Sequence, residues 1–173
     1  MSAPPPGTCE GRQEACRMAG IRDRVDDALL LWEYGRREGA FLCALVAFAA
    51  TARRRYPKMS DRGSFERFLA DSHKERVSVE YRGRCHPIET IMYKWLRCQL
   101  VHEGETPVDL KFMDEQEPGG TSVRAGGAPE YILKIGFGWF DHMFAQVCGA
   151  PENSGEFADL LTSAPDENPP ATQ

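Results

Sequence analysis

The sequence lacks an apolar run long enough to cross a lipid bilayer. Its longest apolar stretch, Phe41–Ala52, is about half of the roughly 20 residues that a membrane-spanning helix needs. No charged segment followed by an apolar block stands near the N-terminus, so we expect no secretory signal. The sequence therefore predicts a cytoplasmic protein with no membrane partner.

The sequence also lacks paired cysteines of the kind that bind metals. Zinc sites usually contain two cysteines a few residues apart, and this spacing does not occur among Cys9, Cys16, Cys43, Cys85, Cys98 and Cys148. Without an export signal we expect a reducing compartment, in which thiols stay free. We predict no metal and no cofactor.

Positive charge is scarce in the second part of the chain. Residues 101–173 contain 3 Lys or Arg against 13 Asp or Glu, whereas residues 1–100 contain 18 against 13. The net charge of −5 argues against general affinity for nucleic acid, but it leaves room for a basic face in the first part. The 173 residues, 42% of them hydrophobic, have the composition of one globular domain.

Proline and apolar periodicity divide the chain into three parts. Residues 1–17 show no apolar period and are predicted to be a flexible lead. Residues 18–150 are predicted to form one domain. Residues 151–173 are rich in proline and acidic side chains, which indicates a flexible tail.

Helical periodicity dominates the central part. Residues 21–32 follow an amphipathic pattern, and residues 37–56 are apolar on every face over much of their length. A helix of the second kind is either central in its own fold or covered by a partner. Further helices are expected at residues 64–70, 87–102 and 139–147.

The apolar period changes to two between residues 107 and 136. Two alternating segments, 108–112 and 131–135, flank glycine-rich turns around residues 122–124. This pattern predicts a small antiparallel β-meander. The predicted fold class is mainly α: a bundle of four to five helices with a β-meander insert near the C-terminus.

The apolar stripe of the helix at residues 87–102 ends on His102, five residues after Arg97. At about 100° per residue, these side chains lie about 140° apart around the helix axis, so they flank a groove. A histidine on an apolar helix face is more often a hydrogen-bonded core or interface residue than a catalyst. It is also favoured by the helix dipole at a C-terminus.

The order of helices together with the segment Arg97-Cys98-Gln99-Leu100-Val101-His102-Glu103-Gly104 resembles the HEPN superfamily over residues 21–104. An arginine followed by four to six residues and a histidine marks that family. The resemblance implies a helical bundle that forms a homodimer with both motifs in one cleft. It also implies metal-independent RNA cleavage, as in a toxin–antitoxin or phage-defence system with an antitoxin-like protein partner.

The resemblance implies a role for each motif residue. His102 would act as general acid or base, and Arg97 would bind the scissile phosphate. Many active relatives carry a polar residue after the arginine, where this chain has Cys98. The alternative is therefore a non-catalytic module that binds RNA or a protein. Arg53, Arg54, Arg55 and Lys58 could guide RNA, and they could equally form a solvated helix end.

Overall fold

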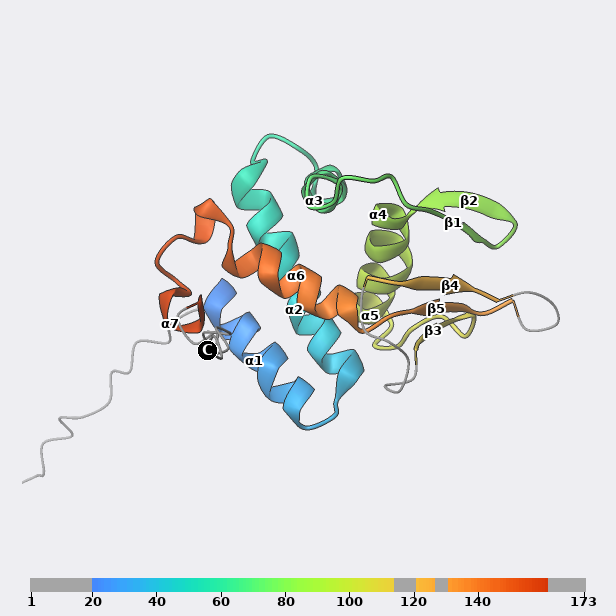
Figure 1. Ribbon diagram of the computed structural model, residues 1–173, viewed down its shortest axis with the longest axis horizontal. Helices are drawn as coiled ribbons and strands as arrows, with labels where there is room; N and C mark the ends of the chain where they lie inside the picture. The colour runs from blue at the N-terminus through green and yellow to red at the C-terminus, as the bar shows by residue number, and fades with distance from the viewer. Residues whose placement is uncertain (1–19, 114–120, 127–130, 162–173) are drawn as a thin grey trace, which may run out of the picture.

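The computed structural model describes residues 20–113, 121–126 and 131–161, and it is mainly helical with two small sheets (Figure 1). This confirms the predicted mainly α class. The predicted flexible lead, residues 1–17, lies outside the described residues. The main helices are α1 (Ile21–Glu33), α2 (Arg37–Arg55), α3 (Asp61–Ala70) and α6 (Gly138–Cys148). No helix in the described ranges is long and apolar enough to cross a membrane.

Helix α2 lies at the centre of the chain. Helices α1, α3 and α6 pack against different sides of it. Its buried apolar residues therefore cover more than one face, as the sequence pattern indicated: Ala40, Phe41, Ala44, Leu45, Ala47, Phe48, Ala49 and Ala52. The first of the two explanations for an all-round apolar helix therefore holds. Helix α2 is central in its own fold, and no second copy is needed to cover it.

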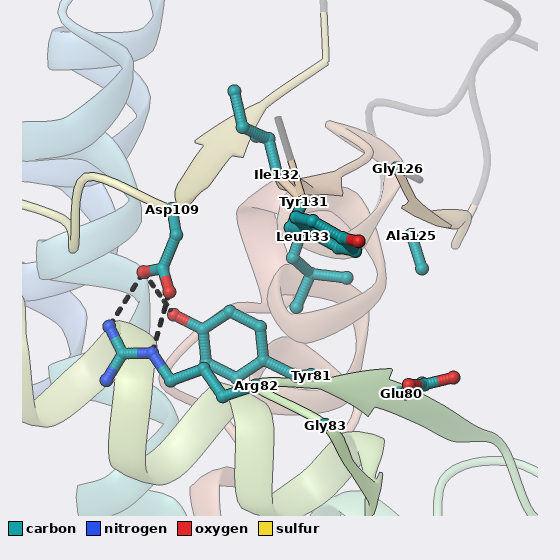
Figure 2. A pocket seen from close by; sticks show the side chains of 10 residues that line it. All are labelled: Glu80, Tyr81, Arg82, Gly83, Asp109, Ala125, Gly126, Tyr131, Ile132 and Leu133. Atoms are coloured by element: carbon teal, nitrogen blue, oxygen red, sulfur yellow. Dashed lines mark hydrogen bonds and ion pairs between the residues drawn. The ribbon is translucent and has the colours of Figure 1, made fainter. Parts of the chain in front are cut away.

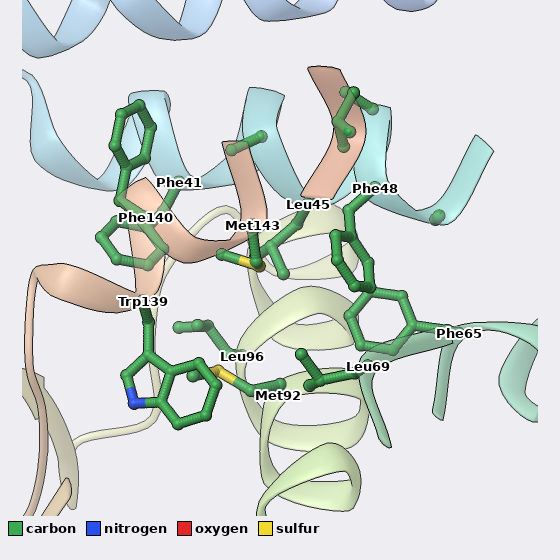
Figure 3. Close-up of a cluster of buried hydrophobic side chains, with 14 of the residues drawn as sticks. Phe41, Leu45, Phe48, Phe65, Leu69, Met92, Leu96, Trp139, Phe140 and Met143 are labelled. Carbon is green, nitrogen blue, oxygen red and sulfur yellow. The ribbon is translucent and has the colours of Figure 1, made fainter. Parts of the chain in front are cut away.

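The core continues from α2 into α3 and α6 (Figure 3). Phe48 packs against Phe65 and Phe68 of α3, with ring centroids 5.1 and 4.6 Å apart. Helix α3 begins at Asp61, earlier than the start predicted at residue 64, because Ser60 caps it. The Ser60 hydroxyl accepts a hydrogen bond from the Gly63 N–H at 3.1 Å.

The predicted helix at residues 87–102 is present, but its centre is a π-helix. The segments follow one another without a break: α4 (Ile88–Thr90), η1 (Ile91–Arg97) and α5 (Cys98–His102). Gly104 follows this helix with a φ of +77°, as expected of a glycine beyond a helix end. A π segment adds a residue to the turn and is often found at functional sites. Here it ends at Arg97.

Two small sheets lie side by side at one end of the helices (Figure 1). The first is an antiparallel hairpin of β1 (Ser78–Tyr81) and β2 (Arg84–Pro87). The second has the order β3-β5-β4, formed by β3 (Leu110–Phe112), β4 (Val123–Ala125) and β5 (Leu133–Ile135). The predicted antiparallel meander is therefore wrong in one respect. Strand β5 lies between the other two, parallel to β3 and antiparallel to β4, whereas a meander would place β4 in the middle.

Residues 151–161, the C-terminal strap, pack on the helices instead of forming the start of a flexible tail. The strap contains η2 (Pro151–Asn153) and α7 (Ala158–Leu161). Phe157 is 1% exposed, and the amide of the buried Asn153 donates to Thr51 Oγ1 and to the Val147 carbonyl at 2.9 Å each. Buried apolar area and satisfied polar groups offset the entropy of ordering the strap. The rest of the predicted tail, residues 162–173, lies outside the described residues.

We expect Asn153→Ala to lower the free energy of unfolding by about 1–3 kcal/mol, because it leaves buried polar groups without partners. Urea unfolding followed by circular dichroism measures this change. The control is Asp159→Asn, which removes an exposed ion pair between the strap and Arg22 and should cost clearly less than Asn153→Ala. If Asn153→Ala lowered the free energy of unfolding no more than the control does, the strap would not be part of the cooperatively folded unit.

Candidate functional site

Arg97 is held in place by a carboxylate of α3. Its Nη1 lies 3.0 Å from Asp61 Oδ2, and the guanidinium carbon lies 5.3 Å from the ring centroid of Tyr93. The Arg97 side chain is 19% exposed. Its Nε is buried and has no hydrogen-bond partner among the described residues. The orientation of the guanidinium is thus fixed, and a phosphate would have to share it with Asp61.

Tyr93 completes this arrangement from the same helix. Its hydroxyl donates to Asp61 Oδ2 at 2.9 Å. Burial raises the pKa of Tyr93 to about 12, and the hydrogen bond to Asp61 acts in the same direction. Tyr93 is therefore neutral near neutral pH, and its hydroxyl remains a donor to the Asp61 carboxylate. Cys98, the residue after Arg97, is half-buried beside this group.

His102 is the last residue of α5 and is exposed. Its side chain forms no hydrogen bond or ion pair with any described residue, and none joins it to Arg97. Arg97 faces α3, whereas His102 stands at the open end of the helix. The two predicted catalytic side chains are thus not brought together within one chain. A site that uses both needs a second surface.

The predicted RNA-binding arginines at the end of α2 are occupied. Arg54 donates to Glu156 at 2.6 Å and to Asn153 at 2.8 Å, and Arg55 makes two bonds to Glu152 at 2.8 and 2.9 Å. All three partners belong to the C-terminal strap. Arg53 donates to the Met59 carbonyl, and Lys58 is exposed without a partner in the described ranges. The ordered arginines fasten the strap, and RNA would have to displace its carboxylates.

A cavity of about 440 Å³ lies between the two sheets, and the polar groups of three lining residues, Tyr81, Arg82 and Asp109, satisfy one another (Figure 2). Asp109 Oδ1 accepts from the Tyr81 hydroxyl at 2.6 Å, and Arg82 donates to both Asp109 oxygens at 2.7 Å. Arg82 and Gly83 form the two-residue turn of the β1–β2 hairpin with positive φ angles of 54° and 71°. This Arg82–Asp109 clip fastens the hairpin tip to the segment before β3, so we interpret it as structural.

A second cavity, of about 540 Å³, contains an acid and a base that the sequence analysis missed. Glu89 is 11% exposed at its side chain, and its Oε1 lies 3.2 Å from Nε2 of His73. His73 Nδ1 lies 2.7 Å from the Glu75 carbonyl oxygen. A carbonyl only accepts, so Nδ1 carries the proton of the neutral ring, and Nε2 then faces Glu89 with a lone pair. The neutral ring offers Glu89 no hydrogen bond, whereas a protonated ring forms an ion pair with it.

The sequence did carry a signal for Glu89. It stands three residues before Met92 and seven before Leu96, both of which are buried, so it falls on the apolar face of its helix. A carboxylate on that face is unusual, because buried acidic side chains are normally paired. His73 had no such signal, because it lies in a connection whose path only the fold determines.

Ser72 and His142, near the same cavity, do not form an activated nucleophile. The Ser72 hydroxyl donates to the Leu69 carbonyl at 2.6 Å, so it accepts from His142 Nε2 at 2.7 Å. A serine activated by histidine needs the opposite direction of donation. Burial lowers the pKa of His142, and nearby His73 lowers it further. Across the described ranges, no three His, Cys, Asp or Glu side chains are grouped to hold a metal ion.

The Arg82–Asp109 clip predicts a specific pH dependence. The hydrogen bond from Arg82 lowers the pKa of Asp109 to about 2, below the value of about 3.9 in an unfolded chain. The clip's contribution is therefore complete above pH 4 and is lost as the pH falls towards 2. We expect Asp109→Asn to cost about 2 kcal/mol at neutral pH, a gap from wild type that closes between pH 4 and pH 2.

Urea unfolding at a series of pH values measures this gap. The matched control is Glu80→Gln, because Glu80 lines the same cavity, is exposed and has no partner among the described residues. Its gap from wild type should stay near zero at every pH. A pH-independent gap for Asp109→Asn would contradict the assigned charge pair.

Comparison with known proteins places the chain in a family. No curated protein and no solved structure matches it. The model of the Rv1289 family matches residues 20–160. This range begins at the residue that caps α1 and ends within α7, so it includes Arg97, His102, the Glu89 cavity and nearly all of the C-terminal strap. Because the match spans most of the chain, the protein belongs to the Rv1289 family.

Proposed function

We propose that the protein acts on RNA as a pair of identical chains, with His102 as the proton-transfer group and Arg97 as the phosphate-binding group. The observation that supports this most directly is the exposed imidazole of His102. It stands without a partner in the described ranges, at the end of the helix that also carries an oriented guanidinium. The resemblance to the HEPN superfamily supplies the reaction.

The reaction needs no group beyond these side chains and the RNA. The 2′-hydroxyl attacks the neighbouring phosphorus, and His102 accepts its proton as the new P–O2′ bond forms. The P–O5′ bond breaks, and an imidazolium returns a proton to the leaving 5′-oxygen. The products are a 2′,3′-cyclic phosphate and a 5′-hydroxyl. Arg97 would stabilise the charge that builds on the non-bridging oxygens.

The proposal requires two copies because one chain does not bring its own Arg97 and His102 together. Next to His102 the helix end exposes Val101 (43%), and the following segment exposes Val108 (91%). Exposed apolar side chains beside a functional group favour contact with another protein surface. A twofold axis at this end would place His102 of each chain near the helix of the other.

Two observations favour the alternative of a non-catalytic binding module. Asp61 already neutralises Arg97, and Cys98 stands where many active HEPN proteins carry a polar residue. In that case the same helix end would bind RNA or an antitoxin-like protein without cutting. A partner that covered His102 would also silence an active site, so both versions place the partner at this surface.

If the chain cuts RNA, His102→Ala should lower the cleavage rate by about 10²–10⁴-fold, the usual contribution of a general acid or base. Arg97→Ala should also abolish cleavage. Single-stranded RNA digested by the purified protein in EDTA should still give cyclic phosphate ends. The control is Glu103→Ala, which changes the exposed residue next to His102 and should cut as wild type does. Intact RNA with the wild-type protein would favour the binding module.

We expect a dimer in solution, with a sedimentation mass of about twice 19.4 kDa. Val101→Glu combined with Val108→Glu should shift the protein towards monomer, because each carboxylate would be buried in the interface. Analytical ultracentrifugation at micromolar concentration measures both. A wild-type monomer would contradict the shared site, and a dimer that the double variant leaves intact would place the interface elsewhere.

A further inference from the structure

The 540 Å³ cavity lies between the C-terminal half of α3, the connection that follows it and the first turn of the 88–102 helix. Its volume is within the usual range for small-molecule sites, about 300–1,000 Å³. It shares no lining residue with the cavity at the Arg82–Asp109 clip, and it contains neither Arg97 nor His102. It is therefore a separate candidate site, independent of the proposed action on RNA.

Glu89 gives the cavity a buried carboxylate whose one charged neighbour in the described ranges is His73. It is 91% buried as a residue (9% exposed) and accepts no hydrogen bond from a described residue. Its neighbour His73 is fixed by the Glu75 carbonyl and, when neutral, turns a lone pair towards it. A buried carboxylate normally has a cation or several donors as partners. A ligand that brings a cation would supply what the fold omits.

The charges near the cavity mouth divide into satisfied pairs and free groups. Arg67 is paired with Asp71 at 3.0 Å, and Glu66 accepts from Arg62 and Thr90 at 2.9 Å each. Three exposed side chains of the lining have no partner among the described residues: Lys74, Glu75 and Arg76. The mouth therefore offers two cations and one carboxylate to a ligand.

We propose that this cavity binds a free basic amino acid. The side-chain ammonium or guanidinium of the ligand pairs with Glu89, its α-carboxylate with Lys74 and Arg76, and its α-ammonium with Glu75. Each unsatisfied charge of the cavity then meets one of opposite sign. Simpler ligands leave some unmet: a diamine has no carboxylate for the two cations, and a neutral amino acid has no distal cation for Glu89.

Isothermal titration of the full chain with L-arginine and L-lysine tests the proposal, and analogues isolate each contact. L-citrulline and L-norleucine keep the α-groups but lack the distal charge, whereas agmatine and cadaverine keep the distal cation but lack the carboxylate. We expect a basic amino acid to bind at least about tenfold more tightly than either kind of analogue. Absence of binding by both L-arginine and L-lysine, or equal binding of the uncharged analogues, would overturn the proposal.

Variants test the residues. Glu89→Gln, which keeps the shape and removes the charge, should weaken binding at least about tenfold, as should Lys74→Ala combined with Arg76→Ala. The control is Lys58→Ala, an exposed lysine outside the cavity, which should bind as wild type does. A thermal melt shows that each variant is folded. Wild-type affinity in folded Glu89→Gln would overturn the role of Glu89, and if that variant does not fold, the analogue series decides.

Discussion

The apolar surface of α2 must be kept from water on nearly every side, and this constraint decides where the other elements lie. A helix with a single apolar stripe needs one neighbour, but α2 needs several, and α1, α3 and α6 supply them. The path of the chain follows from this requirement. The two small sheets and the helix at residues 88–102 are left at one end (Figure 1), where both cavities form.

The basic end of α2 shows how the same helix organises charge. Arg54 and Arg55 stand where cations suit the helix dipole, and the strap carboxylates of Glu152 and Glu156 meet them there. The hydrogen bond from Arg55 lowers the pKa of Glu152. A cluster that looks like a nucleic-acid surface in the sequence thus serves an internal contact. For this reason the proposed action on RNA is assigned to the open end of the 88–102 helix and not to these arginines.

The helices could be predicted because their apolar periods are local properties of the sequence. The apolar pattern of α2 left two explanations open, a central position in its own fold or cover by a partner, and the packing of α1, α3 and α6 selects the first. The parallel pairing of β3 with β5 could not be predicted, since alternation identifies strands but does not say which strand lies beside which. The strap was missed because its burial rests on two residues, Asn153 and Phe157, in a segment of otherwise flexible composition. The pairing of Arg97 with Asp61 joins residues from different helices, and no spacing reveals it.

The polar groups of this structure fall into two classes: those that find hydrogen-bond partners within the chain and those that do not. Asp109 has donors for both oxygens, and Asn153 has partners for its amide and carbonyl, so both stabilise the fold. Glu89 and His102 are different. The first is buried beside a ring that cannot donate to it when neutral, and the second is exposed at a helix end with no partner in the described ranges. A buried carboxylate that accepts no hydrogen bond and has a single histidine beside it costs free energy, and a protein retains that cost where a ligand or substrate recovers it. The argument for a ligand is therefore stronger at Glu89 than at His102, because leaving an exposed imidazole free costs the fold nothing.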